Sequence, residues 1–402
     1  MKGSWVSAAE AARRLGVKRE TLYAYVSRGL IRSAAKGATT RERVYAREDI
    51  ERARRRAEDR RDPSAIATHA LRLGSPVLES GITLIQDGRL YYRGFNAVEL
   101  SRGRSIREVA SLIWRGRFDA WPERRAPAVQ PRAPRTLPFL ATAQTVLAAA
   151  ASHDSAAFDL RADAVAATGA RILDLMVLAA SGIGSGPDDE PIELRLAEGW
   201  KLQRRAGELL RAAIILCADH ELNVSAFTAR CVASAAASPW DVVSAGLAAL
   251  KGARHGGHTA RVEALFREAA AGGMGMDARQ ILAGRLRRGE EIPGFGHPLY
   301  PDGDPRGAAL LALAAGLAPD SPAVGEARAL AEAGRELLGE HPTIDLGLVA
   351  LSRALDLPEH TPLALFALGR TIGWIGHAIE EYALNRLIRP RAAYVGEPPA
   401  PA

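Results

Sequence analysis

Apolar residues recur with helical spacing over most of the chain. From about residue 137 to residue 390, runs rich in Ala and Leu alternate with breaks at Gly and Pro. These runs contain no visible repeat of fixed length, and they are typical of helices that pack closely on one another. The pattern predicts a mainly α-helical protein with a large helical body.

A strand pattern stands out at only one place in the body. Residues 81–94 hold two short apolar runs on either side of Asp87-Gly88, a dipeptide that is typical of a tight β-hairpin turn. Residues 120–136 are rich in Pro and Arg, and residues 181–191 are rich in Gly and Pro. Both of these stretches predict loops rather than helices or strands.

The first 62 residues follow a different pattern. Ser7 and Glu10 have the spacing of a capping box at the start of a helix, and Gly16 ends that helix. A second helix is predicted over residues 19–28, and residues 30–45 predict a β-wing. Two short helices joined by a tight Gly turn are typical of a helix-turn-helix.

The net excess of positive charge in the chain lies in this N-terminal segment. Residues 1–62 contain 17 Lys and Arg against 9 Asp and Glu, whereas the remaining residues are nearly neutral within a total of +7. The segment ends in a predicted basic helix over residues 49–62, and residues 63–71 predict a linker. This uneven charge favours an N-terminal unit, residues 1–62, that binds a polyanion.

Composition narrows the classes of protein. A chain of 402 residues that is 48% hydrophobic and 25% charged has room for two or three domains and is not mostly disordered. Two cysteines exclude a disulfide scaffold, and together with an N-terminus that lacks a signal pattern they predict a cytoplasmic protein. No uncharged apolar run reaches about 18–20 residues, so no membrane span is predicted.

Histidines mark the candidate site. His220 follows Asp219 in a polar stretch, whereas His255 and His297 lie beside glycines, which let a ligand approach the backbone closely. Three histidines in such surroundings favour a site over structural roles in the core. His258 stands three residues after His255, but two histidines without further ligands are not enough for a metal, and none is predicted.

The N-terminal residues 3–56 resemble the winged helix-turn-helix of MerR and excisionase-like regulators. The resemblance rests on residues 7–17, 21–23 and 43–49. It implies duplex DNA as a partner, although basic side chains that only solvate a helical face remain an alternative. The residues implied in DNA binding are Arg19, Tyr23 and Tyr25 on or near the recognition helix, and Lys36, Arg41 and Arg43 in the wing.

The rest of the chain, residues 72–396, resembles the citrate synthase family. The resemblance implies an all-α body over residues 72–402 with a smaller subdomain within about 260–370, a homodimer with a shared active site, and no cofactor besides acetyl-CoA as co-substrate. It rests on blocks in the family's order: Asp-His-Glu-Leu-Asn-Val-Ser at 219–225, Leu-Lys-Gly-Ala-Arg-His-Gly-Gly at 250–257, Pro-Gly-Phe-Gly-His at 293–297, Asp-Pro-Arg at 304–306, Ile-Asp at 344–345, Ala-Leu-Gly-Arg-Thr-Ile-Gly-Trp at 367–374 and Arg-Pro-Arg with Tyr-Val-Gly at 389–396.

The resemblance also implies a role for each site residue. His255 stabilises the enol oxygen of the acyl-CoA, Asp345 removes the methyl proton, and His297 polarises the ketone of oxaloacetate. A carboxylate base acting together with a hydrogen-bond donor suits a weak carbon acid, and Arg suits a dianionic keto acid. The residues implied in oxaloacetate binding are His220, Arg306, Arg370 and, from the partner subunit, Arg389.

One stretch departs from the family. A basic residue that helps to bind the CoA phosphates usually follows the histidine at position 297, but residues 298–303 contain none. Arg285, Arg287 and Arg288 are the candidates to replace it. Three functions stay open: citrate synthesis, 2-methylcitrate synthesis from propionyl-CoA, and transcriptional regulation in which the body senses a keto acid or an acyl-CoA.

Overall fold

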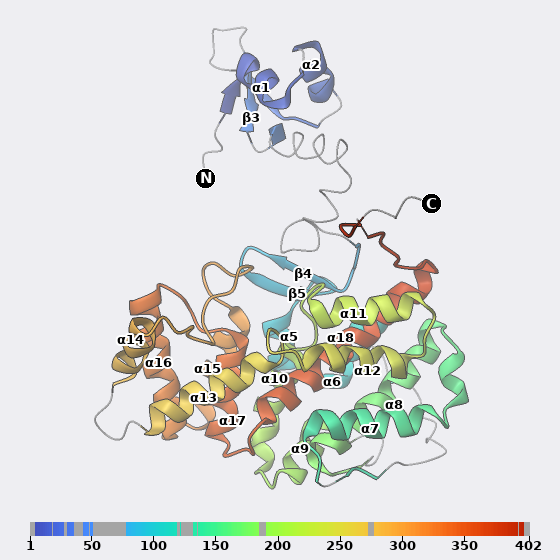
Figure 1. Ribbon diagram of the computed structural model, residues 1–402, viewed down its shortest axis with the longest axis vertical. Helices are drawn as coiled ribbons and strands as arrows, with labels where there is room; N and C mark the ends of the chain where they lie inside the picture. Colours follow the sequence, from blue (N-terminus) through green and yellow to red (C-terminus); the bar gives the residue numbers. More distant parts are fainter. Residues whose placement is uncertain are drawn as a thin grey trace. The chain divides into compact units, whose positions relative to one another are not determined.

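The computed structural model confirms the mainly α-helical class (Figure 1). It divides into two compact units, residues 1–79 and 80–402. The predicted linker and most of the predicted basic helix before it lie outside the described residues. The structure describes residues 5–17, 19–27, 30–35, 43–47, 49–50, 78–118, 121, 132–134, 136–184, 190–271, 277–392 and 394–397.

The N-terminal unit is a helix-turn-helix joined to a small sheet. Ser7 caps the first helix by accepting a hydrogen bond from the backbone N–H of Glu10, and Gly16 ends it with a φ of +63°. The strands are antiparallel in the order β1-β3-β2, so β2 and β3 form the predicted wing. The elements are β1 (Trp5–Ser7), α1 (Ala8–Leu15), α2 (Arg19–Ser27), β2 (Ser33–Ala35) and β3 (Arg43–Ala46).

A small apolar core holds this unit together. Leu22 of α2, Tyr45 of β3 and Ile31 between them are almost fully buried. The Asp49 carboxylate accepts hydrogen bonds at 2.8 Å from both the backbone N–H and the guanidinium Nε of Arg32, which ties the wing to the residues after it. Strand β1 was not predicted, because three residues are too few for an alternating pattern.

The body begins with the predicted hairpin. Asp87 and Gly88 both have positive φ, at +51° and +69°, as the turn requires, and β4 pairs with β5 in antiparallel register. The strands are β4 (Thr83–Gln86), β5 (Arg89–Tyr92) and β6 (Phe95–Asn96). The helices are α5 (Ala97–Gly103), α6 (Ile106–Arg115), α7 (Phe139–Ala151), α8 (Ala162–Ser181), α9 (Ile192–Gly199), α10 (Gly207–Leu216), α11 (Val224–Ser234), α12 (Pro239–Leu250), α13 (Gly257–Ala271), α14 (Ala278–Arg287), α15 (Pro305–Leu317), α16 (Pro322–Leu338), α17 (Ile344–Ala354) and α18 (Thr361–Leu384), with 3₁₀ turns at Ser155–Phe158 and Arg204–Ala206.

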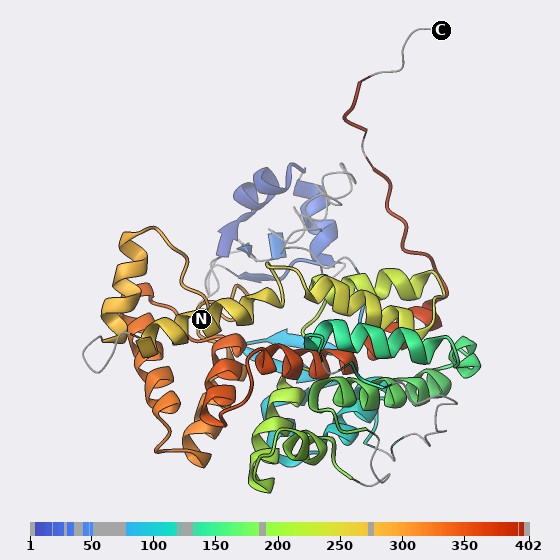
Figure 2. The ribbon, with the colours of Figure 1, turned by 60° about the horizontal axis from the view of Figure 1, so that its bottom comes forward.

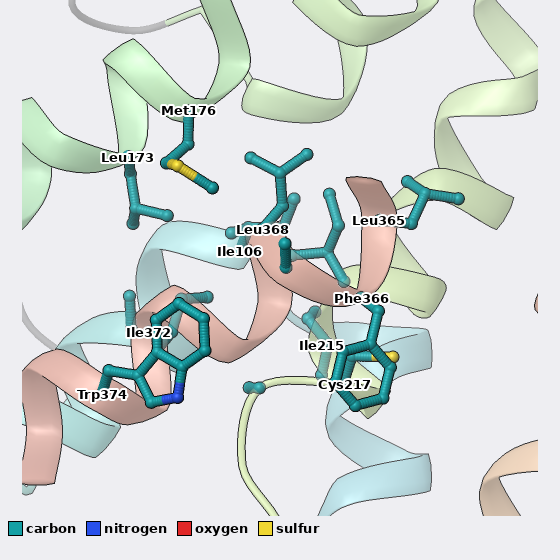
Figure 3. Packing of buried hydrophobic residues seen from close by; sticks show 14 of the residues in the cluster. Ile106, Leu173, Met176, Ile215, Cys217, Leu365, Phe366, Leu368, Ile372 and Trp374 are labelled. Carbon is teal, nitrogen blue, oxygen red and sulfur yellow. The ribbon is translucent and has the colours of Figure 1, made fainter. Parts of the chain in front are cut away.

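Helix α18 runs through the middle of the body and organises the larger core (Figure 1). Its 24 residues are buried over most of their length, and Figure 3 shows Leu368, Ile372 and Trp374 among side chains from neighbouring helices. Gly373 lets the helix approach the chain that follows α10, because a Cβ atom there would lie only 2.6 Å from Asp219 Oδ1. This contact brings Arg370 of α18 close to another predicted site residue, His220.

A second apolar core lies under helices α13, α14, α16 and α17. Its buried side chains come from residues 262–350 and include Phe266, Phe295 and Leu346. Figure 1 shows these helices gathered at one side of the body, away from α7 and α8. Helices α15 and α17 contribute side chains to both cores or pack against both. The body therefore contains two apolar cores that meet at these two helices.

Helix α8 is the one described helix that is long and apolar enough, by length and composition alone, to cross a membrane. However, 67% of its most apolar window is buried inside the body. Two of its charged residues form ion pairs there: Arg171 with Asp154, and Asp174 with Arg195, each at 2.6 Å. These are the contacts of a helix in a protein core.

Candidate active site

Six of the seven site residues predicted in the body come together in the structure. His220 and His297 pack edge to face with ring centroids 5.0 Å apart. Arg306 and Arg370 act electrostatically on His220, Arg370 acts on His255, and Arg306 acts on Asp345. The group therefore has three imidazoles, two guanidinium groups and one carboxylate, which come from six positions between residues 220 and 370.

A tyrosine that the sequence analysis did not single out completes the histidine cluster. Tyr300 follows His297 by one turn, since its backbone N–H donates to the His297 carbonyl at 2.9 Å. Its ring is almost fully buried, and its hydroxyl lies 3.0 Å from His220 Nε2. The guanidinium of Arg306 lies 5.3 Å from the ring centroid, within the range of a cation–π contact. Tyr300 thus fixes one nitrogen of His220.

His297 is held as a neutral hydrogen-bond donor. The backbone N–H of Leu299 donates to His297 Nδ1 at 3.2 Å, so in the neutral ring the proton lies on Nε2. Burial, with a further contribution from the positive charge of Arg306, lowers the pKa of His297 to about 4. The ring is therefore neutral near pH 7, and its Nε2–H is available to polarise a carbonyl oxygen.

His255 is neutral for a similar reason. Burial and then the charge of Arg370 lower its pKa to about 4. Its Nε2 lies 2.8 Å from the hydroxyl of Ser225, which also accepts a hydrogen bond from Trp374 Nε1 at 3.2 Å. When the Ser225 hydroxyl donates to Nε2, the single ring proton of the neutral imidazole lies on Nδ1, which can donate to a substrate atom. The imidazole ring also packs edge to face with Phe366.

Asp345 lies in the first turn of α17. The N-cap position of this helix is Thr343, so Asp345 lies two residues inside the first turn rather than at the cap position. Burial raises the pKa of Asp345, and the nearby His258 and Arg306 oppose that rise. A carboxylate with a raised pKa is a stronger base than an exposed one, which suits the removal of a proton from carbon.

The two buried arginines differ in what they bind within the chain. Arg306 is paired with Asp304 through two bonds, from Nε to Oδ1 at 2.9 Å and from Nη2 to Oδ2 at 2.8 Å. Asp304 also accepts the backbone N–H of Ile344 at 3.0 Å, which positions the start of α17. Arg306 is therefore a buried, anchored cation, and it is not a residue of an exposed turn.

The guanidinium of Arg370 has N–H donors that are not used within the described part of the chain. Its side chain is almost fully buried and lies over the ring of Phe366, 4.9 Å from the centroid. Within the described part of the chain, its Nε and Nη1 have no hydrogen-bond partner. Buried donors without partners are costly, so this guanidinium is suited to bind a carboxylate brought by a ligand.

Arg389 lies apart from this group. Helix α18 ends at Leu384, where Asn385 takes a left-handed conformation, and the chain then leaves the body as an extended segment (Figure 2). Arg389 is exposed on that segment, together with Leu387 and Tyr394. The protomer thus does not use Arg389 in its own group of six, which leaves the partner's site as the predicted place.

The residues predicted to replace the missing CoA-phosphate contact are partly engaged. Arg285 pairs with Glu268 at 2.6 Å, and Arg288 donates from Nη2 to Glu290 at 3.0 Å. The loop after His297 exposes only Pro298, Pro301 and Asp302. The exposed cations Lys251 and Arg254 lie on the loop that holds His255. Among the described residues, no group of His, Cys, Asp and Glu is arranged to hold a metal ion.

The predicted DNA-binding residues are only partly described. Tyr23 is 52% exposed on α2, and Arg43 is exposed at the start of β3. Tyr25 is half-buried and packs against the core of the N-terminal unit, so less of its ring faces solvent. The Arg19 backbone begins α2, whereas the Arg19 side chain lies outside the described part, as do Lys36 and Arg41.

Comparisons with known proteins agree with both resemblances. The family described as "Citrate synthase, C-terminal domain" matches residues 72–391, and the family described as "Helix-turn-helix domain" matches residues 5–57. The chain is 31% identical to a citrate synthase of Haloferax volcanii over 81% of this chain and 94% of that protein. It is 28% identical to a 2-methylcitrate synthase of Shewanella oneidensis, over 77% and 89% of the two chains.

A solved structure shares the fold of the body. It is the citrate synthase of Thermoplasma acidophilum in a ternary complex with carboxymethyl coenzyme A and oxaloacetate. The TM-score is 0.71 at 24% identity, over 83% of this chain and 97% of that one. At this identity the likeness shows the fold alone.

Proposed function

The chain belongs to the citrate synthase family, and we propose that it condenses acetyl-CoA, or a related short acyl-CoA, with oxaloacetate. The observation that carries the proposal is a pair of neutral imidazoles, His255 and His297, grouped with a buried carboxylate, Asp345. Two donors held neutral near pH 7, together with one base, are what enolisation and attack on a ketone require.

Each step of this condensation can then be assigned to a residue of the site. Asp345 takes a proton from the carbon next to the thioester carbonyl, while His255 donates from Nδ1 to the oxygen on which negative charge develops. His297 donates from Nε2 to the ketone oxygen, and the enol carbon attacks the ketone carbon to form the new C–C bond. Water then cleaves the thioester and releases CoA as a thiol. Proton removal from carbon is feasible because the charge on oxygen is stabilised as it forms.

The keto acid is held by positive charge in a dry site. Arg370 offers its unpartnered Nε and Nη1 to one carboxylate, and Arg306 adds a buried cation beside Tyr300. Arginine forms paired, charge-assisted bonds to carboxylates that Lys does not reproduce. His220, fixed by Tyr300 and kept neutral, supplies a further polar contact next to His297.

The test is release of thiol from purified protein supplied with oxaloacetate and a series of acyl-CoAs. We expect release that depends on oxaloacetate, and the preferred chain length decides between citrate and 2-methylcitrate synthesis. A pocket typically discriminates one methylene by about 10- to 200-fold, so acetyl- and propionyl-CoA should separate clearly. Binding of oxaloacetate without turnover of any acyl-CoA would instead favour a body that senses its ligand.

The N-terminal helix-turn-helix domain supports a second candidate function, binding of duplex DNA. Tyr23 stands exposed on the second helix, where a recognition helix contacts bases. Arg43 is exposed on the wing, and residues 1–62 carry a charge of +8. A body that forms a dimer would present two such domains, which favours a palindromic site.

We expect the full-length protein to bind duplex DNA with an affinity that falls steeply as salt rises, because phosphate contacts release counterions. Arg43→Ala should weaken binding to all sequences and reduce the salt slope by about 1, whereas Tyr23→Ala should change the sequence preference. Fluorescence anisotropy against a random duplex pool measures both. Arg13→Ala, on the exposed side of α1 and paired with Glu10, is the matched control. Binding that ignores salt would contradict this function.

A further inference from the structure

Asp219 occupies an unusual position beside the substrate-binding arginine. Its side chain is fully buried, and both carboxylate oxygens are engaged by other elements. Thr83 of β4 donates to Oδ2 at 2.6 Å, and His377 of α18 lies with Nε2 3.1 Å from Oδ1. The Arg370 Nη1 atom is 3.8 Å from Oδ1, which is within an ion-pair distance but too long for a hydrogen bond.

A buried Asp and a buried Arg this close would normally form a direct bond. Charge-assisted bonds between such groups shorten to about 2.7–2.9 Å, as they do between Arg306 and Asp304 in the same site. The backbone of Asp219 is also restrained, since its N–H donates to the Tyr92 hydroxyl at 3.3 Å and its carbonyl accepts from that hydroxyl at 3.2 Å. The 3.8 Å separation between Arg370 Nη1 and Asp219 Oδ1 therefore depends on the hydrogen bonds that restrain the Asp219 carboxylate.

We propose that Thr83 and His377 are positioning residues that hold the Asp219 carboxylate away from Arg370, so that Arg370 keeps open donors for the keto-acid carboxylate. The negative charge of Asp219 stays near enough to make the buried guanidinium tolerable. Its oxygens stay turned toward Thr83 and His377, which leaves Nε and Nη1 of Arg370 without a partner in the chain. This proposal rests on the proposed function, because it assigns the donors of Arg370 to a keto acid.

The arrangement predicts competition when the restraint is removed. Without the Thr83 hydroxyl, Oδ2 of Asp219 loses its shortest hydrogen bond, and rotation of the carboxylate toward Arg370 becomes the best replacement. The substrate carboxylate must then displace an internal ion pair before it binds. The expected effect is weaker binding of the keto acid. The affinity for the acyl-CoA and the rate of the chemical step should change little.

The first experiment is Thr83→Val, which keeps the shape of the side chain and removes the donor. We expect KM for oxaloacetate, and its Kd by calorimetry, to rise about tenfold, in line with one lost hydrogen bond to a charged group. KM for the acyl-CoA should stay within about twofold. Thr142→Val, a buried threonine of α7 outside the site, is the matched control and should change neither constant.

The second experiment separates positioning from a general structural role. In the Thr83→Val background, Asp219→Asn removes the charge that competes for Arg370, so oxaloacetate affinity should return toward that of the parent protein. A structural defect would instead be deepened by the second change. Thr83→Ala serves the same comparison if the valine variant does not fold, as judged by its thermal transition.

The outcomes are distinct from those that test the proposed function. If the parent protein releases thiol but Thr83→Val leaves the Kd for oxaloacetate unchanged, the positioning role is wrong and the enzyme assignment stands. If Asp219→Asn lowers the affinity of the Thr83→Val variant further, the positioning role is also wrong. If the parent protein neither binds oxaloacetate nor turns it over, both proposals fall together.

Discussion

Asp345→Asn should lower kcat by at least about 100-fold, because it removes the base that takes the proton from carbon. Asparagine keeps the size and most hydrogen bonds of the side chain, so the start of α17 should fold as before. The measurement is oxaloacetate-dependent thiol release at saturating substrates. Asp356→Asn, an exposed residue just beyond the same helix, is the matched control and should retain full activity. An unchanged kcat in Asp345→Asn would show that Asp345 is not the base.

The same site predicts the shape of the pH profile. Burial raises the pKa of Asp345, and protonation of that carboxylate on the acid side removes the base, so kcat should fall as pH decreases toward that pKa. The two catalytic histidines have pKa values of about 4 and are neutral throughout the range from about pH 6 to pH 8. Titration of either imidazole near pH 6.5, followed directly by NMR of the ring protons, would contradict neutral His255 and His297.

Much of the site was predictable from sequence because its residues lie in short blocks with unusual neighbours. Glycines beside His255 and His297 mark a backbone that a plain core does not need, whereas Asp345, Arg306 and Arg370 were implied only by the resemblance to the citrate synthase family. Tyr300 was within reach of the same reasoning, since it stands one turn after His297. The tyrosine was missed because an aromatic residue in that position is equally well explained as part of a core.

Other features depend on contacts that no local pattern encodes. Thr83 and Asp219 are 136 positions apart, and only the packing of the hairpin against the body brings them within 2.6 Å. Arg285 looked free in the sequence, yet it pairs with Glu268 across two helices. The helix-turn-helix was predicted because capping residues and Gly turns are local signals, whereas the ion pair between Arg32 and Asp49 is not local.

Arg389→Ala should lower kcat/KM for oxaloacetate by about 10²-fold, since a lost bond from a charged donor to a carboxylate costs about 1.5–3 kcal/mol. Arg389 is exposed on the segment after α18 and does not join its own protomer's group of six residues. The apolar side chains of Leu387, Tyr394 and Val395 on that segment are 60%, 78% and 95% exposed, which favours a second copy of the chain as their cover. We therefore expect a homodimer with a shared site, burying well over about 2,000 Å².

Mixing two variants that have little activity at low oxaloacetate concentration tests the shared site directly. When Arg389→Ala and Asp345→Asn protomers exchange at random, half of the dimers are mixed, and each mixed dimer holds one site with both residues intact. Activity should recover to about one quarter of that of the unaltered protein, as two-fold symmetry requires. Arg370→Ala mixed with Asp345→Asn is the control: both residues belong to one protomer's site, so no intact site forms and activity stays lost. If the first mixture also stays inactive after exchange is verified with differently tagged protomers, Arg389 serves its own subunit and the shared site is excluded.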